Sequence, residues 1–225
     1  MSRGAFVTGT DTGVGKTLAA CALVHAVAAR GIAVKAMKPI AAGAIIHDGG
    51  WANADSVALA RATGDNAPMA DITPILLREP MAPHIAAARE KRRITLEPVR
   101  AAFGRLGAHC EFVVVEGVGG FLVPLDDELD GADLARALAL PVVLVVGLRL
   151  GCLNHALLTA RAIAAAGLPL AGWIANAIDA AMAVPDENVA ALQARLGAPL
   201  LGRFPFEEHA NAAALARRLD VAPLV

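Results

Sequence analysis

The chain of 225 residues contains no tyrosine, and aromatic residues make up only 4% of it. Its core must therefore come mainly from aliphatic side chains. No apolar run reaches the length that spans a membrane without a Gly or Pro interruption. The formal net charge is −1, and the chain has no basic block. We therefore expect neither a membrane nor a nucleic acid as the main partner.

Cysteine is scarce as well, with only Cys21, Cys110 and Cys152, which are scattered and odd in number. This pattern does not suit a disulfide framework. The N-terminus lacks the charged, apolar and cleavage-site order of a signal peptide. We expect a reduced, cytoplasmic protein. Its length suits one α/β domain, and neither a repeat nor a linker divides residues 1–225, so we expect a single domain.

Strand-like and helix-like patterns alternate along the chain. Residues 41–51, rich in Gly and small residues, read as a loop. A helix through Arg61 begins at Asn53 or Asp55, either of which suits an N-cap. The repeated β–α units predict an α/β fold, a mostly parallel sheet flanked by helices on both faces. Strands are expected at 5–8, 32–37, 72–77, 112–115, 141–146, 170–175 and 200–202, and the other helices at 16–30, 95–106, 154–166, 187–196 and 212–219.

The segment Gly9–Thr17 is the strongest functional signal. It reads Gly-Thr-Asp-Thr-Gly-Val-Gly-Lys-Thr, follows an apolar strand and leads into a helix pattern. This is the arrangement of a P-loop, in which backbone N–H groups and a helix N-terminus hold phosphates. Lys16 is expected to reach the terminal phosphates, and the Thr17 hydroxyl to bind Mg²⁺. The spacing is unusual, because five residues separate Gly9 from Gly15.

Two charged residues lie where ligands bind in such sheets, at the carboxyl ends of strands, and a third, Asp55, lies at a helix start. Lys38 follows one strand and points at phosphates or at an anionic substrate, unless it is a solvated surface residue. Glu116 ends another strand, where P-loop proteins place a carboxylate near the metal; the alternative is a turn-forming Glu. From local sequence Asp55 is better read as a helix cap, although Thr17, Asp55 and Glu116 would form a sensible Mg²⁺ set.

Two further segments carry weaker signals. Backbone N–H groups of Leu150–His155, which precedes a helix, could receive a carboxylate. Cys152 has no CxxC partner, which argues against a metal or redox role. Asn176 ends a strand and could read a nucleobase through its amide.

Taken together, these motifs resemble the dethiobiotin synthetase family of ATP-dependent carboxylases. The resemblance runs in order to about Pro205, and the five-residue P-loop spacing is the family's. The matching segments are Phe6–Thr17, Lys38–Gly43, Pro83–His84, Val115–Gly120, Leu140–Gly147, Leu150–His155, Leu170–Asn176 and Pro199–Gly202.

The resemblance implies a homodimeric P-loop enzyme that converts 7,8-diaminononanoate, CO₂ and ATP to dethiobiotin, ADP and phosphate. One substrate amine becomes a carbamate, ATP phosphorylates it, and the second amine closes the ring. Lys16, Lys38 and Thr12 would act on the reacting groups, and Thr17, Asp55 and Glu116 would hold Mg²⁺.

The remaining contacts implied by the resemblance fall into two groups. The substrate would contact Lys38 and Ala42, and its carboxylate would contact the second subunit's copy of the segment Gly151, Cys152, Leu153 and Asn154. The nucleotide would contact Thr12, Gly13, Val14, Gly15, Lys16, Thr17, Asp55, Glu116, Gly117, Val118, Gly119, Asn176, Pro205, Phe206 and Glu207.

Several positions depart from the family pattern. Gly13 replaces an acidic residue of several members, Ala42 replaces a common Ser, and the segment after Pro205 aligns poorly. Two rival functions remain open. A P-loop amidation enzyme usually carries a glutaminase domain, for which we see no room. A ParA- or MinD-like ATP switch usually carries a second Lys early in the P-loop, and Gly9–Thr12 has none.

Overall fold

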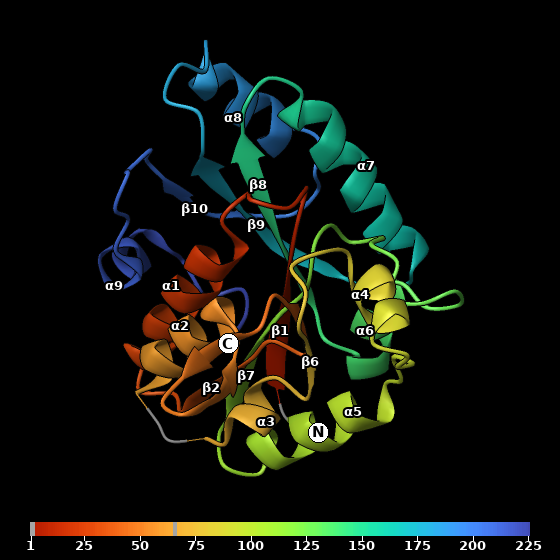
Figure 1. Cartoon of the computed structure of the whole chain (residues 1–225). Coiled ribbons are helices and arrows are strands. Elements are labelled where there is room, and N and C mark those ends of the chain that lie inside the picture. Colours follow the sequence, from red (N-terminus) through yellow and green to blue (C-terminus); the bar gives the residue numbers. More distant parts are fainter. Residues whose placement is uncertain (1–2, 65–66) are drawn as a thin grey trace.

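Six parallel strands form the central sheet of the computed structural model, which describes residues 3–64 and 67–225. The strand order is β10-β9-β8-β1-β7-β2 (Figure 1). The expected α/β class with a parallel sheet is confirmed. The strands are β1 (Arg3–Gly9), β2 (Val34–Met37), β7 (Phe112–Glu116), β8 (Val142–Leu148), β9 (Leu170–Ala177) and β10 (Leu200–Phe204).

Helices cover both faces of this sheet, as the sequence predicts (Figure 1). Side chains alternate across β1, so that Ala5 and Val7 pack with α1 while Phe6 packs in the core on the opposite face. The helices are α1 (Lys16–Ala28), α2 (Ala54–Thr63), α3 (Met69–Ile72), α4 (Pro83–Arg89), α5 (Glu97–Gly107), α6 (Gly131–Leu138), α7 (Cys152–Ala165), α8 (Pro185–Gln193), α9 (Ala212–Leu215) and the 3₁₀ turn η1 (Ala216–Arg218). No helix among the described residues is both long and apolar enough to cross a bilayer.

The register of the central strands brings three loops to one edge. Val7 of β1 lies beside Glu116 of β7, and Met37 of β2 lies beside Val115. Because parallel strands end at the same edge, the P-loop, Lys38 and Glu116 are neighbours in space. The sheet topology therefore brings together charged residues that are far apart in the sequence.

The expected loop at residues 41–51 is wrong. Residues of this segment form β3 (Ile40–Ala42) and the antiparallel hairpin β4 (Ile45–His47) and β5 (Gly50–Ala52). Asp48 and Gly49 both have positive φ at the turn, which is the geometry that Asp-Gly favours in two-residue hairpins. The Asp-Gly pair was thus the missed signal.

Two other expectations need correction. The strand expected at 72–77 is only β6 (Ile75–Leu77), because residues up to Ile72 form α3 after Pro68. Helices α4 and α6 were not anticipated. The N-terminus of α6 carries a capping box in which the side chains of Asp130 and Asp133 each accept a backbone N–H.

The three cysteines are free, and Cys21 lies buried on α1. Burial disfavours the thiolate and raises the pKa of Cys21 to about 12, from an ordinary value of 9.0. Above pH 9 the unfolded chain therefore loses a proton that the folded protein keeps. The buried Cys21 thiol therefore contributes to the free energy of unfolding below pH 9, and this contribution is lost as the pH rises above 9.

We predict that wild-type protein loses roughly 1 kcal/mol more unfolding free energy than Cys21→Ala between pH 8 and pH 10. Urea unfolding of both proteins at the two pH values measures the difference. The packing change in the variant is common to both pH values and cancels. Parallel losses in the two proteins would show that Cys21 ionises as freely in the folded protein as in the unfolded chain.

Candidate active site

The P-loop connects β1 to α1, and two glycines with positive φ set its backbone conformation. Gly13 and Gly15 have φ of +75° and +86°, values that favour glycine. Val14 between them is buried, and its carbonyl accepts a 2.9 Å hydrogen bond from the Asn176 amide. A Cβ on Gly15 would overlap that same amide. The Asn176 amide on β9 therefore fixes the loop just before α1, where a helix N-terminus can receive an anion.

The Lys16 side chain is folded back onto the loop. Its Nζ donates to the carbonyl oxygen of Asp11 at 2.8 Å. Burial, and next the nearby charge of Lys38, lower the pKa of Lys16 to about 8. Phosphate oxygens would favour the charged form and would offer Nζ stronger acceptors than one carbonyl.

Lys38 lies at the centre of a buried ion cluster. Its Nζ is 2.5 Å from Glu116 Oε1 and 2.9 Å from Asp55 Oδ2. The side chains of Lys38 and Glu116 are 5% and 1% exposed, so water screens neither charge, while that of Asp55 is 40% exposed. The structure therefore decides against a solvated surface Lys38 and a turn-forming Glu116.

The charges of this cluster shift one another's pKa values. Burial alone would lower the pKa of Lys38, but the carboxylates of Glu116 and Asp55 raise it above its ordinary value. Burial would likewise raise the pKa of Asp55, but the Lys38 ammonium lowers it. For Glu116 burial dominates, and the pKa is raised. Lys38 is thus held as a cation and is unsuited to act as a general base.

Asp55 reaches the cluster because Asn53 fixes the start of α2. The Asn53 side chain accepts from the Asp55 N–H at 3.0 Å, which makes Asn53, and not Asp55, the N-cap. Its amide nitrogen donates to the carbonyls of Ala42 and Gly43 at 3.1 and 3.0 Å. The buried Asn53 side chain therefore connects the two ends of the hairpin segment. Because Asn53 caps α2, the Asp55 carboxylate can pair with Lys38 instead.

Thr17, Asp55 and Glu116 suit a Mg²⁺ ion. The Thr17 hydroxyl donates to Glu116 Oε1 at 2.9 Å, and Glu116 Oε2 is buried without a hydrogen-bond partner. An orphaned carboxylate oxygen beside a hydroxyl and a second carboxylate fits a hard cation. No group of three or more His, Cys, Asp and Glu that could hold a metal occurs among the described residues. Mg²⁺ beside a nucleotide needs fewer, because phosphates and water complete its shell.

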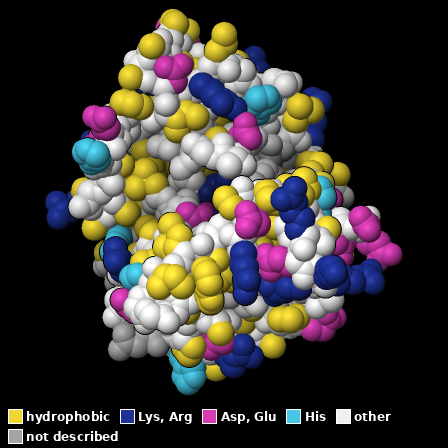
Figure 2. Space-filling view, in the orientation of Figure 1, with side chains coloured by type: hydrophobic (Ala, Val, Ile, Leu, Met, Phe, Trp, Pro, Cys, Tyr) yellow, Lys and Arg dark blue, Asp and Glu magenta, His cyan; other side chains and the backbone are white. Residues whose placement is uncertain are grey.

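A cavity of about 700 Å³ opens above this cluster, and Figure 2 shows a hollow in the middle of this face. Its size suits a substrate together with a polyphosphate. Its lining combines polar residues and glycines with small and apolar side chains. The polar residues and glycines are Thr12, Gly13, Gly15, Lys16, Thr17, Lys38, Asn53, Asp55, Glu116 and Gly119, and the small and apolar residues are Ala41, Ala42, Pro80, Met81, Ala82, Pro83, Val118 and Val123.

Several expected site residues lie outside this cavity. Asn176 is buried and binds the P-loop carbonyl, as described above. Pro205 and Phe206 line a separate cavity of about 380 Å³ together with Leu148 and Ala177, and Glu207 is exposed. Gly117 approaches the ring of Phe6 rather than the cavity. The segment Gly151, Cys152, Leu153 and Asn154 starts α7 and lines none of the large cavity.

Sequence reasoning missed two positioning elements. Arg149 donates to Asp11 Oδ2 at 2.6 Å, while Asp11 Oδ1 accepts from the Thr12 N–H at 2.7 Å. This ion pair ties the P-loop to the turn before α7. The apolar wall at Pro80–Pro83 was also missed. Neither has a local signal, since both depend on contacts between distant segments.

Several known proteins are similar to this chain. The family model of the AAA domain matches residues 3–214. A protein of Aromatoleum aromaticum named ATP-dependent dethiobiotin synthetase BioD is 53% identical, over 95% of this chain and 95% of its own length. Proteins of the same name from Nitrosospira multiformis and Ralstonia nicotianae are each 52% identical, over 99% and 98% of this chain and 96% of their own lengths.

Two solved structures support the fold alone. A ParA family ATPase from Chlorobium tepidum has a TM-score of 0.54 at 17% identity, covering 92% of this chain and 86% of its own. The signal recognition particle 54 kDa protein from Aeropyrum pernix, in complex with GDP, has a TM-score of 0.54 at 18% identity. That match covers 99% of this chain and 46% of the other.

We predict that Lys38→Met destabilises the protein by about 3–5 kcal/mol, because it leaves Glu116 buried without a counter-charge. Chemical unfolding measures the loss. Arg30→Ala is the matched control, because Arg30 and Asp220 form a 3.7 Å pair whose side chains are 45% and 68% exposed. Removing such an exposed pair costs under about 1 kcal/mol. Equal losses in the two variants would refute the burial argument.

Proposed function

Because this chain belongs to the ATP-dependent dethiobiotin synthetase family, we propose that it catalyses the family's cyclo-ligase reaction. The substrates are 7,8-diaminononanoate, CO₂ and ATP, and the products are dethiobiotin, ADP and phosphate. Two observations support this assignment: the name that the relatives share, and a large cavity whose lining combines polar and apolar residues. The apolar wall suits an alkyl chain, and the lysines and P-loop suit anions.

The triphosphate lies along the P-loop in this proposal. Backbone N–H groups of Gly13, Val14 and Gly15 hold phosphate oxygens, and Lys16 leaves Asp11 to bind the terminal phosphates. This exchange replaces a carbonyl acceptor by charged oxygens, which form stronger hydrogen bonds. Gly13 carries no acidic side chain, so position 13 adds no negative charge beside the phosphates.

The carbamate lies between Lys38 and the P-loop. One amine of the diamine attacks CO₂, and the carbamate oxygen then takes the γ-phosphoryl group of ATP. The second amine attacks the carbamate carbon, the C–O bond to phosphate breaks, and the ring closes. Lys38, which is held as a cation, stabilises the anionic carbamate oxygens, and Thr12 contacts the reacting groups. The protein supplies position and charge rather than covalent chemistry.

Thr17, Asp55 and Glu116 are the residues that would hold Mg²⁺. When bound, Mg²⁺ would neutralise charge on the phosphates. At the purine end, Asn176 and the segment Pro205, Phe206 and Glu207 flank the adenine. The cavity of about 380 Å³ that Leu148, Ala177 and Phe206 line, after the carboxyl ends of β8 and β9, supports this assignment.

The substrate carboxylate is received by a second subunit. Gly151, Cys152, Leu153 and Asn154 start α7 outside the large cavity, so a site that uses their N–H groups needs a partner's copy of them. Leu150, Leu158 and Leu122 are 96%, 55% and 56% exposed, and the last two line a cavity with Thr12. A homodimer would cover this apolar surface. Ala42 offers no hydroxyl, so the substrate amines rely on other contacts.

We predict phosphate release from ATP that requires both the diamine and bicarbonate, with dethiobiotin formed in equal amount. The observation behind this is the protonated Lys38 between the P-loop and the apolar wall. Phosphate measurement with mass detection of dethiobiotin tests it. Slow phosphate release that ignores the diamine would instead favour an ATP switch.

We predict that Glu116→Gln raises the Mg²⁺ concentration needed for half-maximal ATP binding by tenfold or more, because one anionic ligand is lost. Calorimetric titration at several Mg²⁺ concentrations measures it. Asp133→Asn, which alters a carboxylate in the cap of α6, is the control. An unchanged Mg²⁺ dependence would remove Glu116 from the metal site.

We predict a dimer in analytical ultracentrifugation and dissociation by Leu158→Glu, which buries a charge in the proposed interface. The monomer should keep ATP affinity and lose diamine binding. Ile46→Glu alters an equally exposed apolar residue on the hairpin, and this variant should stay dimeric. Normal diamine binding by monomers would contradict the shared site.

A further inference from the structure

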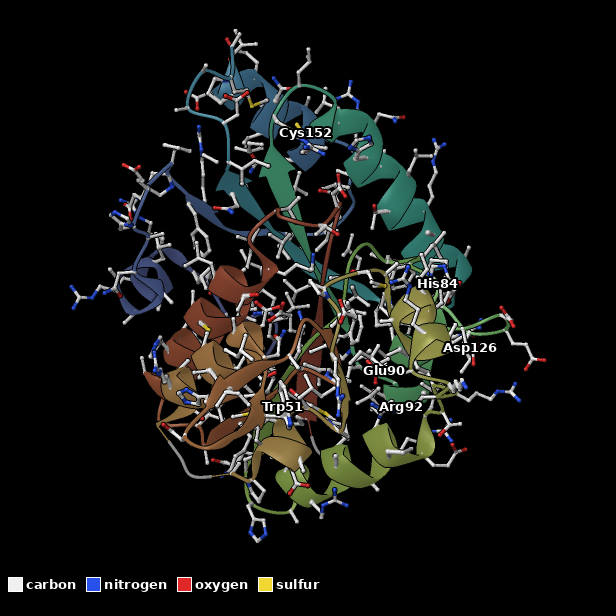
Figure 3. All side chains as sticks on the ribbon, in the orientation of Figure 1. Trp51, His84, Glu90, Arg92, Asp126 and Cys152 are labelled. Carbon is white, nitrogen blue, oxygen red and sulfur yellow. The ribbon has the colours of Figure 1, made fainter. Side chains whose placement is uncertain are left out.

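A second cavity, of about 590 Å³, lies against the β4–β5 hairpin. It shares no lining residue with the large cavity. In Figure 3 Trp51 lies on one side and Glu90 and Arg92 lie on the other. The lining residues are Ala44, Trp51, Leu76, Arg78, Arg89, Glu90 and Arg92. None of them belongs to the proposed catalytic machinery.

The charge of this cavity is strongly unbalanced. Its lining carries three arginines and one acidic residue, Glu90. Glu90 is already committed, because Oε1 accepts from the backbone N–H of Arg78 at 2.6 Å and Oε2 is 3.2 Å from Arg92 Nη1. Arg92 also donates to the Leu76 carbonyl at 2.7 Å. The single carboxylate of Glu90 cannot neutralise three arginines, so the lining of the cavity keeps a net positive charge.

Arg89 is the third arginine that lines this cavity. Within residues 3–64 and 67–225, no hydrogen bond or ion pair of its side chain is found. It lies in the last turn of α4 and is exposed. A guanidinium offers two parallel N–H donors, which match a carboxylate or a phosphate. An anion is therefore the complementary ligand.

Trp51 supplies an apolar surface beside these cations. Its side chain is 55% exposed, and the Arg78 guanidinium lies 5.7 Å from the ring centroid. It is paired across the hairpin with Ile46, which is 64% exposed. A half-exposed indole with one cation against it offers a flat surface on which a planar ligand can stack.

We propose that this cavity binds a small anion with a flat apolar body, such as an aromatic or heterocyclic carboxylate or phosphate. The anionic group binds Arg89, and the flat body packs on Trp51 next to Arg78. The cavity volume lies in the range of small-molecule sites. A simple inorganic anion would leave the indole uncovered, and a neutral ring would leave Arg89 unpaired.

The β4–β5 hairpin and the residue that follows it contribute to both cavities, because Trp51 lines the second cavity and Asn53 lines the large one. Asn53, which lines the large cavity, directly follows β5 and holds the carbonyls of Ala42 and Gly43 before β4. The Ala44 N–H donates to the Arg78 carbonyl at 2.9 Å. A ligand on Trp51 therefore contacts the segment that carries Asn53 into the active site, although its binding does not depend on the reaction proposed above.

The two tryptophans make a direct test practical. Trp173 is fully buried, whereas Trp51 is exposed in the cavity. In ¹⁵N-labelled protein each indole N–H gives one NMR signal, and Trp51→Phe assigns them. Benzoate is the probe, acetate is the anion without a flat body, and benzyl alcohol is the flat body without charge. Each titration is repeated with saturating Mg-ADP to fill the nucleotide site.

We expect benzoate to shift the Trp51 signal saturably, with the Trp173 signal unmoved and with Mg-ADP present or absent. Acetate and benzyl alcohol should bind at least tenfold more weakly. Arg89→Ala should weaken benzoate about tenfold, as expected for the loss of a charge-assisted hydrogen bond. Arg217→Ala, an exposed arginine outside the cavity, should leave benzoate binding unchanged.

Three results would overturn the proposal. These are no saturable shift of the Trp51 signal, equal affinity for acetate and benzoate, and unchanged benzoate affinity in Arg89→Ala. Thermal unfolding of Arg89→Ala checks that the variant is folded. Arg89→Gln, which keeps a polar side chain without its charge, should weaken benzoate to the same degree, and wild-type affinity there would also overturn the proposal.

Discussion

The buried contact between Lys38 and Glu116 is the interaction on which the active site depends. Neither charge can be solvated in place, because both side chains are almost fully buried. Each therefore needs the other, and this requirement fixes the ends of β2 and β7 together at one edge of the sheet. Thr17 from α1 and Asp55 from α2 then attach to the same pair. Residues on or next to four elements thus meet at one buried ion pair.

The same pair belongs to a set of four charges that balance one another. Lys16 and Lys38 lie near Asp55 and Glu116, so the four formal charges cancel. A triphosphate would bring excess negative charge. The Lys16 ammonium, which donates to the Asp11 carbonyl, and the buried Oε2 of Glu116, which suits a cation, are the groups that would respond. A bound nucleotide and its metal would therefore replace these contacts with their own.

Much of this arrangement could be predicted from the sequence, because local pattern decides it. Apolar strands alternating with helices gave the parallel sheet, and Gly9–Thr17 gave the phosphate loop. Asp55 was the instructive failure, since local sequence favoured a cap, whereas Asn53 caps the helix and frees Asp55 for Lys38. The Arg149–Asp11 pair joins residues 138 positions apart. No local pattern encodes such a contact; it follows from how β8 lies beside β1.

The most direct test of the Lys38–Glu116 contact is a double-mutant cycle of unfolding free energies with Lys38→Met and Glu116→Gln. If the two charges depend on each other, the double variant loses less stability than the sum of the single losses, by about 1–3 kcal/mol. The second substitution then removes the charge that the first left buried. Additive losses would contradict the account, because they would mean that Lys38 and Glu116 contribute independently and that the site is assembled by other contacts.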